Sequence, residues 1–202
     1  MAIEFDNATF DLPKSTGNLI KVIGVGGGGG NMVNHIIRVN PNLNIDLIVA
    51  NTDAKALENS LAHTKIQLGE KTTKGLGAGM RPEIGKAAAE ESYDEVKSAL
   101  ETSDIVFIGT GLGGGTGTGA APVVAQAAKD IGALTVAVVT MPFMFEGKKR
   151  RKLADCGLEE LRKESDSIVV IPNDKLLTLI DKNAGIKESF EMVDEVLARA
   201  VN

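Results

Sequence analysis

Glycine and threonine dominate residues 109–119, which lie between a short apolar run and a segment of helical composition. Seven glycines and three threonines occur among these eleven residues, a composition that cannot pack a hydrophobic core. Residues without a Cβ let a ligand approach the main chain, and a helix that begins after a glycine-rich turn offers free N–H donors and the positive end of its dipole. Threonine hydroxyls add donors that suit phosphate oxygens. The stretch therefore predicts a phosphate-binding loop.

A second glycine-rich segment, residues 24–31, follows another apolar run. By itself it satisfies the G-x-G-x-x-G pattern, and Asp53 lies about where a dinucleotide fold places its ribose-binding acid. The NAD(P)-binding domain of an oxidoreductase is therefore an alternative interpretation. A dinucleotide needs one such loop for its pyrophosphate, however, whereas two loops could enclose a triphosphate from both sides. Neither loop contains a lysine and no G-x-x-x-x-G-K-[ST] motif occurs, which argues against the common P-loop NTPases.

The elements that must position these loops alternate between strands and helices. We expect strands at 19–25, 45–50, 65–68, 105–108, 134–139 and 167–171, and helices at 32–38, 54–60, 83–100, 123–131, 148–163, 175–180 and 187–202. Residues 69–81 should form a flexible loop. The alternation predicts an α/β fold: one doubly wound domain whose mostly parallel sheet is covered on both faces. Ligands of such sheets bind at the carboxyl ends of the strands, where both glycine-rich segments fall, together with residues 51–53, 140–147 and 172–174.

Composition limits the possible partners and surroundings of the chain. A net charge of −5 without a broad basic face argues against a nucleic-acid partner. The lone Cys156, expected to be buried or half-buried, provides neither a disulfide framework nor a thiolate cluster, as suits a reducing cytoplasm. No apolar run is long enough to cross a bilayer and no signal peptide is evident, so we expect no direct membrane insertion. Residues 1–18 are polar and predict a flexible arm, which leaves residues 19–202 as the domain.

Several motifs resemble those of a known family. Residues 114–122, Gly-Gly-Thr-Gly-Thr-Gly-Ala-Ala-Pro, are similar to the signature of the tubulin/FtsZ family of GTPases. The similarity runs from about residue 19 to residue 202 and includes segments 24–31, 51–53, 75–79, 145–150 and 172–175. It implies a Rossmann-like GTPase domain that ends at the family's central helix. Within the family, the resemblance is to the bacterial proteins that polymerise into the filaments of the division ring at septum formation.

The resemblance implies contacts with GTP or GDP at positions that match the family's nucleotide-binding motifs. These positions are Gly26, Gly27, Gly28, Asn31, Ala78, Gly79, Met80, Gly114, Gly115, Thr116, Gly117, Glu146, Arg150, Asn173, Phe190 and Asp194. Residues 26–31 would form the first nucleotide loop and residues 114–117 the main phosphate loop. Residues 78–80 would lie near the γ-phosphate and sense GTP against GDP. Glu146 and Arg150 would reach the ribose and its neighbourhood.

Recognition of the base falls, by the same resemblance, to the C-terminal part of the chain. Asn173 would lie at the ribose or base, and Phe190 and Asp194 would hold guanine. Positions 190 and 194 share one helix face, so the ring can stack on the purine while the carboxylate accepts guanine's N–H donors. Adenine lacks that donor pair and would leave the carboxylate unpaired. Without the resemblance, a core phenylalanine and a surface aspartate would be the simpler interpretation.

The sequence contains no convincing residue to activate water for GTP hydrolysis. The resemblance implies that acidic residues on a loop after the central helix act on the nucleotide of the next subunit in a head-to-tail filament. This chain ends within or at the end of that helix, so we expect the C-terminal domain to be absent. An apolar patch should then be exposed near residues 197–201. We expect hydrolysis only when a neighbouring subunit supplies the loop. Mg²⁺ would be held through the phosphates, without a protein metal site. The implied partners are further copies of the chain and other division proteins; a GTP-responsive scaffold that never hydrolyses is a third interpretation.

Overall fold

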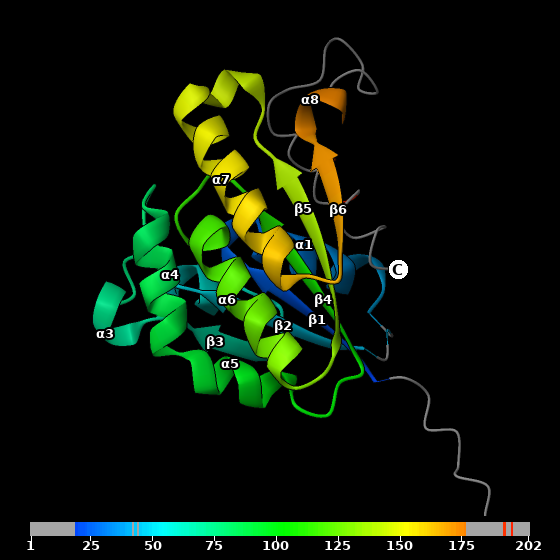
Figure 1. The fold of residues 1–202 in the computed structure, drawn as a ribbon. Helices are drawn as coiled ribbons and strands as arrows, with labels where there is room; N and C mark the ends of the chain where they lie inside the picture. Colours follow the sequence, from blue (N-terminus) through cyan, green and yellow to red (C-terminus); the bar gives the residue numbers. More distant parts are fainter. Residues whose placement is uncertain (1–18, 42, 44, 177–191, 193–194, 196–202) are drawn as a thin grey trace, which may run out of the picture.

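Parallel strands occupy the centre of the structure, a computed structural model that describes residues 19–41, 43, 45–176, 192 and 195. In this part of the chain six strands pair in the order β3-β2-β1-β4-β5-β6, and every pair is parallel. The strands are β1 (Ile20–Val25), β2 (Asp46–Asn51), β3 (Thr64–Gln67), β4 (Ile105–Gly111), β5 (Leu134–Met141) and β6 (Ser167–Pro172). The predicted doubly wound parallel α/β sheet is confirmed (Figure 1).

Helices cover both faces of the sheet (Figure 1). One face carries α4 (Pro82–Glu91), α5 (Tyr93–Leu100), α6 (Thr116–Asp130) and α7 (Lys148–Glu164), and the other carries α1 (Gly26–Val39). Alternation along β1 explains the two layers: Ile23 packs with the first set of helices, whereas Val22 packs with Met32 and Ile36 of α1. The remaining helices are short: α2 (Ala54–Glu58), α3 (Glu70–Thr73), η1 (Met144–Glu146) and α8 (Asn173–Leu176).

The first glycine-rich segment is helical, which corrects the prediction of a loop that extends to Asn31. Helix α1 begins at Gly26, six residues before the expected start at Met32. A Cβ added to Gly29 would overlap the carbonyl oxygen of Gly109 and would lie 2.8 Å from the Cα of Gly24. Only glycine lets the first turn of α1 lie against the backbones of β1 and β4 at this separation. Packing thus overrides the poor helix propensity of glycine.

The expected helix over 83–100 is two helices, and the expected flexible loop 69–81 contains α3. Ser92 lies between α4 and α5, with φ −102° and ψ 19°. Its hydroxyl oxygen accepts a hydrogen bond from the N–H of Gly69 at 3.0 Å and donates to the carbonyl of Gln67 at 3.3 Å. These bonds to the segment between β3 and α3 compete with continuation of the helix. The hydrogen bonds of Ser92 therefore connect the end of α4 to the segment that leads, through α3, to residues 77–79.

Helix α3 is held from outside by the carboxylate of Glu91, the last residue of α4. The carboxylate accepts hydrogen bonds from the N–H groups of Lys71 and Thr72 and from the Thr72 hydroxyl, at 2.6–3.0 Å. The hydroxyl bond from Thr72, followed by the N–H bond from Lys71, lowers the pKa of Glu91 from its ordinary value. The ionised form is therefore the one that the folded chain prefers.

Glu91→Gln is expected to lower the melting temperature at neutral pH by a small amount. Because the pKa is lowered in the folded chain, the carboxylate stabilises the fold above its ordinary pKa, and this contribution disappears as the pH falls through the lowered value. Thermal unfolding of both proteins across the acidic range should show the two melting temperatures converging at low pH. Glu95→Gln, at an exposed glutamate of α5, removes the same charge and is the control for the substitution itself. A gap that stays constant with pH would contradict the account.

Cys156 is exposed, contrary to the expectation of a buried or half-buried side chain. Ala154, Gly157 and Leu161 form the buried stripe of α7, and position 156 falls outside it. No helix among the described residues is long and apolar enough to span a bilayer. The predictions for residues 1–18, for the helix over 187–202 and for the patch at 197–201 lie outside the described residues, except for Met192 and Glu195.

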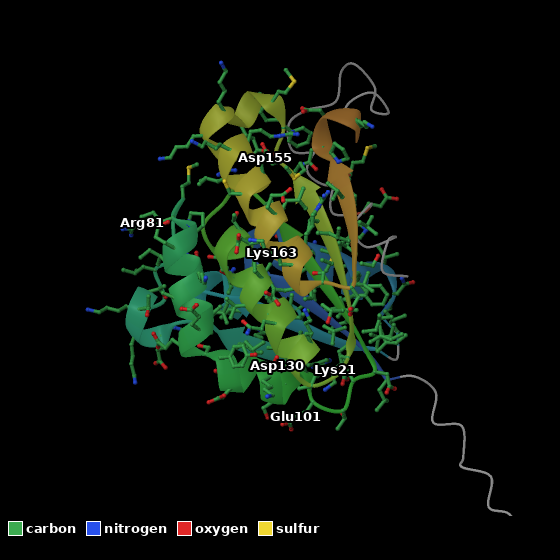
Figure 2. The ribbon with its side chains drawn as sticks, viewed as in Figure 1. Lys21, Arg81, Glu101, Asp130, Asp155 and Lys163 are labelled. Atoms are coloured by element: carbon green, nitrogen blue, oxygen red, sulfur yellow. The ribbon has the colours of Figure 1, made fainter. Side chains whose placement is uncertain are left out.

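The order of the strands decides where a ligand can bind. Strands β1 and β4 are neighbours, and the chain leaves β1 toward one face of the sheet and β4 toward the other. In an open parallel sheet, the crevice outside the carboxyl ends of the strands at this switch point is the usual binding site. Lys21, Glu101 and Asp130 lie near the lower edge of the molecule in Figure 2, near the amino ends of β1 and β4. The binding crevice is therefore expected at the opposite edge of the sheet.

Candidate functional site

A cavity of about 520 Å³ lies at the predicted edge of the sheet. Residues that follow β1, β2, β4, β5 and β6 all contribute to its wall, as expected for a site at the carboxyl ends of the strands. The lining residues are Gly27, Gly28, Asn31, Asn51, Asp53, Ala56, Leu76, Gly77, Ala78, Gly79, Gly111, Leu112, Gly114, Gly115, Thr116, Gly117, Thr140, Pro142, Glu146, Arg150 and Asn173.

The amino ends of α1 and α6 meet in this cavity. A Cβ on Gly28 would lie 2.9 Å from the backbone nitrogen of Gly111, and one on Gly26 would lie 2.8 Å from that of Gly117. Gly26 has φ +71°, a conformation that favours glycine. Neither helix has a side-chain cap, so the first-turn N–H groups of both helices lack the usual side-chain acceptor. Two helix dipoles and two sets of amide donors therefore face one space, an arrangement that suits an anion with several phosphates.

The loop between β4 and α6 has a defined shape. The N–H of Leu112 donates to the carbonyl of Thr140 at 3.0 Å, and the N–H of Gly113 donates to the hydroxyl oxygen of Thr118 at 2.9 Å. Thr118 is almost fully buried, so this second bond is shielded from water. The irregular part of the predicted phosphate loop is thus residues 112–115 alone, and α6 begins at Thr116.

Residues 77–79 close the cavity from the side of β2. The N–H of Gly77 donates to the carbonyl of Thr52 at 3.1 Å, and the N–H of Ala54 donates to that of Gly75 at 3.0 Å. A Cβ on Gly115 would overlap the carbonyl oxygen of Gly79. The segment therefore lies in backbone contact with the predicted phosphate loop.

Glu146, Arg150 and Asn173 form the opposite wall. Glu146 accepts a hydrogen bond from the N–H of Phe143 at 2.9 Å and forms an ion pair with Arg150, four residues later in the chain. Asn173 begins α8 and is 4% exposed. Its Oδ1 atom is buried and has no hydrogen-bond partner among the described residues. A buried amide oxygen without a partner, in the wall of a cavity, is available to a ligand donor.

The structure brings most of the predicted site residues together. Twelve of the sixteen line the cavity: Gly27, Gly28, Asn31, Ala78, Gly79, Gly114, Gly115, Thr116, Gly117, Glu146, Arg150 and Asn173. Gly26 lies behind the wall, against Gly117, and Met80 is outside the lining with 37% of its surface exposed. Phe190 and Asp194 lie outside the described residues.

Other lining residues were not singled out from the sequence. Asn51 and Thr140 belong to strand ends that the sequence marks only as polar segments, and Asp53 stands out only in the dinucleotide interpretation. Leu76 reaches the cavity because it forms an isolated antiparallel bridge with Asp53. The signal available in the sequence was the rule for strand ends; the bridge depends on a tertiary contact that no local pattern reveals.

The chain is similar in sequence and in fold to known proteins. The cell division protein FtsZ of Pseudomonas aeruginosa is 55% identical over 183 residues, which cover 91% of this chain and 46% of that protein. The solved structure of an FtsZ dimer from M. jannaschii superposes with a TM-score of 0.88 at 49% identity, over 93% of this chain and 54% of the other. The chain therefore spans about half the length of these relatives.

A more distant structure extends the similarity. CetZ2 from Haloferax volcanii, solved as a GTPγS-bound protofilament, superposes with a TM-score of 0.80 at 26% identity, over 90% of this chain and 56% of the other. The family model described as the GTPase domain of the tubulin/FtsZ family matches residues 19–181. The strand order alone does not separate the two interpretations, because a dinucleotide-binding domain would have the same order. The similarity to the tubulin/FtsZ family does not favour the oxidoreductase alternative. The chain belongs to the tubulin/FtsZ family, and the described fold is that of its GTPase domain.

Proposed function

We propose that the cavity binds GTP and GDP, with the phosphates at the amino ends of α1 and α6. The observation that carries the proposal is the convergence of two uncapped, glycine-rich helix N-termini on one cavity at the switch point of the sheet. Residues 27–31 and 114–117 would cradle the phosphates, and residues 78–79 would lie beside the γ-phosphate. The GTPγS-bound state named for the CetZ2 relative supports the same ligand class.

Thermal unfolding with different nucleotides tests this proposal against a dinucleotide site. A ligand that binds only the folded chain raises stability by RT ln(1 + [L]/Kd), about 2.7 kcal/mol at a hundredfold excess over Kd. GTPγS should therefore raise the melting temperature in a concentration-dependent manner, whereas NADH should not. A shift with NADH and none with GTPγS would overturn the proposal.

The ribose and base would lie toward Glu146, Arg150 and Asn173. The Glu146–Arg150 ion pair presents fixed acceptor and donor groups at this wall, and the unpaired Oδ1 of Asn173 would accept a ligand N–H or O–H. Phe190 and Asp194 are proposed to complete guanine recognition by stacking and by pairing with its N–H donors. This last part rests on the family resemblance.

Asn173→Leu is expected to change stability and affinity in opposite directions. Replacing an amide whose buried Oδ1 has no partner by an apolar side chain of similar size should raise the stability of the unliganded chain by about 1 kcal/mol. The same change removes an acceptor from the cavity and should weaken GTPγS binding roughly tenfold. Thermal unfolding without ligand and calorimetric titration measure the two effects separately.

Ser165→Ala is the matched control for this variant. The Ser165 hydroxyl is the other buried polar side-chain atom without a partner in the described part of the chain, and it lies outside the cavity lining. Its removal should maintain or raise stability and leave GTPγS affinity unchanged. If Asn173→Leu binds GTPγS as tightly as Ser165→Ala does, Asn173 does not contact the ligand.

Hydrolysis is proposed to need a second subunit. The two carboxylates in the cavity wall already have structural partners: Asp53 accepts from the N–H of Ala56 at the start of α2, and Glu146 pairs with Arg150. Large apolar side chains are exposed in or next to the wall, with Leu76 86%, Met144 82% and Phe145 56% exposed. We infer that this rim docks the next subunit of a head-to-tail filament, which supplies the acidic group that activates water.

Mg²⁺ is proposed to bind through the phosphates. No three His, Cys, Asp or Glu side chains gather as a metal site within the described ranges. Mg²⁺ commonly retains several waters and binds through substrate phosphates with few protein ligands, so the observed wall is compatible with it. The ion would neutralise phosphate charge that the lysine-free cradle leaves uncompensated.

The cellular role that we propose is that of the bacterial division filament. The relative from P. aeruginosa is named a cell division protein, and the CetZ2 relative is named as a protofilament. By analogy, a full-length protein that contains this domain would self-associate head to tail at the division site, in the cytoplasm, and contact other division proteins. GTP turnover by such a full-length protein that rises more steeply than in proportion to its concentration would support a shared active site; turnover per subunit that does not vary with concentration would contradict it.

A further inference from the structure

Thr52 occupies a central place beside the cavity without lining it. It follows β2 and has no exposed surface. Its Oγ1 atom lies 2.7 Å from the Oγ1 of Thr116, the first residue of α6, and 64 positions separate the two residues. Thr116 is half-buried and lines the cavity. A fully buried hydroxyl thus contacts the hydroxyl of a residue that lines the cavity.

Burial determines which of the two hydroxyls donates. Thr116 is the sole hydrogen-bond partner of the Thr52 hydroxyl among the described residues. If Thr116 donated, the Thr52 proton would be buried without an acceptor, a state that proteins avoid. Thr52 therefore donates to Thr116. Since a hydroxyl has one proton, that of Thr116 is not used in this bond and remains available for a ligand in the cavity that Thr116 lines.

The backbone of Thr52 reaches the other side of the cavity. Its carbonyl accepts hydrogen bonds from the N–H of Gly77 at 3.1 Å and from the hydroxyl of Thr73 at 3.2 Å. Gly77 leads directly to Gly79, whose carbonyl oxygen lies against Gly115. One buried residue therefore connects the start of α6 with the segment proposed to lie beside the γ-phosphate.

We propose that Thr52 is a positioning residue that makes Thr116 a hydrogen-bond donor to a phosphate oxygen and not a ligand of a metal ion. The inference rests on the proposed nucleotide site and adds to it the direction of one hydrogen bond. A hydroxyl that donates inward selects an occupant with lone pairs, such as a phosphate oxygen. A hydroxyl that accepts from inside the cavity would suit a cation instead.

Calorimetric titration of GTPγS into single and double variants tests the inference. Thr52→Val retains the shape of the side chain but removes its hydroxyl, and should weaken binding roughly five- to tenfold, the size of one misdirected hydrogen bond. Thr52→Ser retains the hydroxyl and should bind within about twofold of the unaltered chain. In a Thr116→Val background, Thr52→Val should cause no further loss, because the two hydroxyls act as one unit.

Titrations with and without Mg²⁺ distinguish a Thr116 that donates to a phosphate oxygen from a Thr116 that binds a metal ion. The loss caused by Thr52→Val should be the same with Mg²⁺ and with EDTA, because the bond in question goes to the phosphate. A loss that disappears in EDTA would overturn the inference in favour of a metal ligand. Equal losses of GTPγS affinity for Thr52→Ser and Thr52→Val would overturn the inference, because they would show that Thr52 acts through packing and not through its hydroxyl. Additive losses in the double variant would overturn it for the same reason.

The same titrations distinguish failure of the proposed nucleotide site from failure of the role proposed for Thr52. If the unaltered chain does not bind GTPγS, both the nucleotide site and the role of Thr52 are wrong. If it binds and the double variant is additive, only the role of Thr52 is wrong. Thermal unfolding of each unliganded variant shows that it is folded; Thr52→Ala, a second variant without the hydroxyl, replaces Thr52→Val if that protein does not fold.

Discussion

Gly29→Ala is expected to destabilise the chain by about 3 kcal/mol, through overpacking between α1 and the sheet. The added methyl would overlap the carbonyl oxygen of Gly109 and lie 2.6 Å from the carbonyl carbon of Gly24. Both obstacles are backbone atoms of buried strands, so no side-chain rotation can relieve the overlap. Chemical denaturation gives the change in the free energy of unfolding, and the melting temperature should fall by about 6–12 °C for a chain of this size.

Gly30→Ala provides a matched control one residue away. The same methyl at Gly30 would meet only a side-chain carbon of Val49 at 3.6 Å, an ordinary contact. Because alanine is the better helix former, this variant should be more stable by about 0.5–1 kcal/mol. Equal stabilities for the two variants would show that α1 does not lie against the strands as described.

Gly115→Ala is expected to weaken GTPγS binding by roughly thirtyfold or more, equivalent to about 2 kcal/mol. The added methyl would overlap the carbonyl oxygen of Gly79 and would lie 3.0 Å from the Cβ of Ala78. The phosphate loop and residues 78–79 would then have to separate, so the two sides of the phosphate cradle could not contact one ligand together. Calorimetry measures the loss of affinity.

Gly114→Ala distinguishes this separation from the mere presence of a methyl group in the loop. A Cβ on Gly114 would meet no protein atom within 4 Å. The unliganded Gly114→Ala protein should therefore melt at the same temperature as the unaltered chain, whereas unliganded Gly115→Ala should melt lower. Binding by Gly115→Ala within about threefold of the unaltered chain would show that contact between the two segments is unnecessary.

Periodicity and punctuation in the sequence predicted the sheet and most of its helices, because buried strands and amphipathic helices leave local patterns. The exceptions depend on contacts between distant residues. Glycine is a poor helix former, and α1 begins in a glycine run only because Gly29 must lie against Gly109. The break at Ser92 follows from its bonds to Gln67 and Gly69, which the unbroken apolar pattern around it did not reveal.

The features of the candidate site that the sequence predicted are likewise the local ones, and those that it missed depend on contacts between distant residues. The rule that ligands bind at the carboxyl ends of parallel strands correctly grouped five separate segments around one cavity. Motif resemblance could not show that Gly26 lies behind the wall or that Met80 lies outside the cavity lining. Thr52 lies in segment 51–53, which the resemblance includes, but the motif assigns it no role; its proposed role rests on the hydroxyl of a residue 64 positions away.

The identity of the bound nucleotide is the central claim, and titration calorimetry with GTP and ATP under identical conditions tests it most directly. The phosphate cradle at α1 and α6 would treat the two triphosphates alike, so any difference reports on recognition of the base. A site that pairs its acceptors with guanine should bind GTP at least roughly a hundredfold more tightly than ATP. Equal affinities for GTP and ATP would contradict a guanine-nucleotide site.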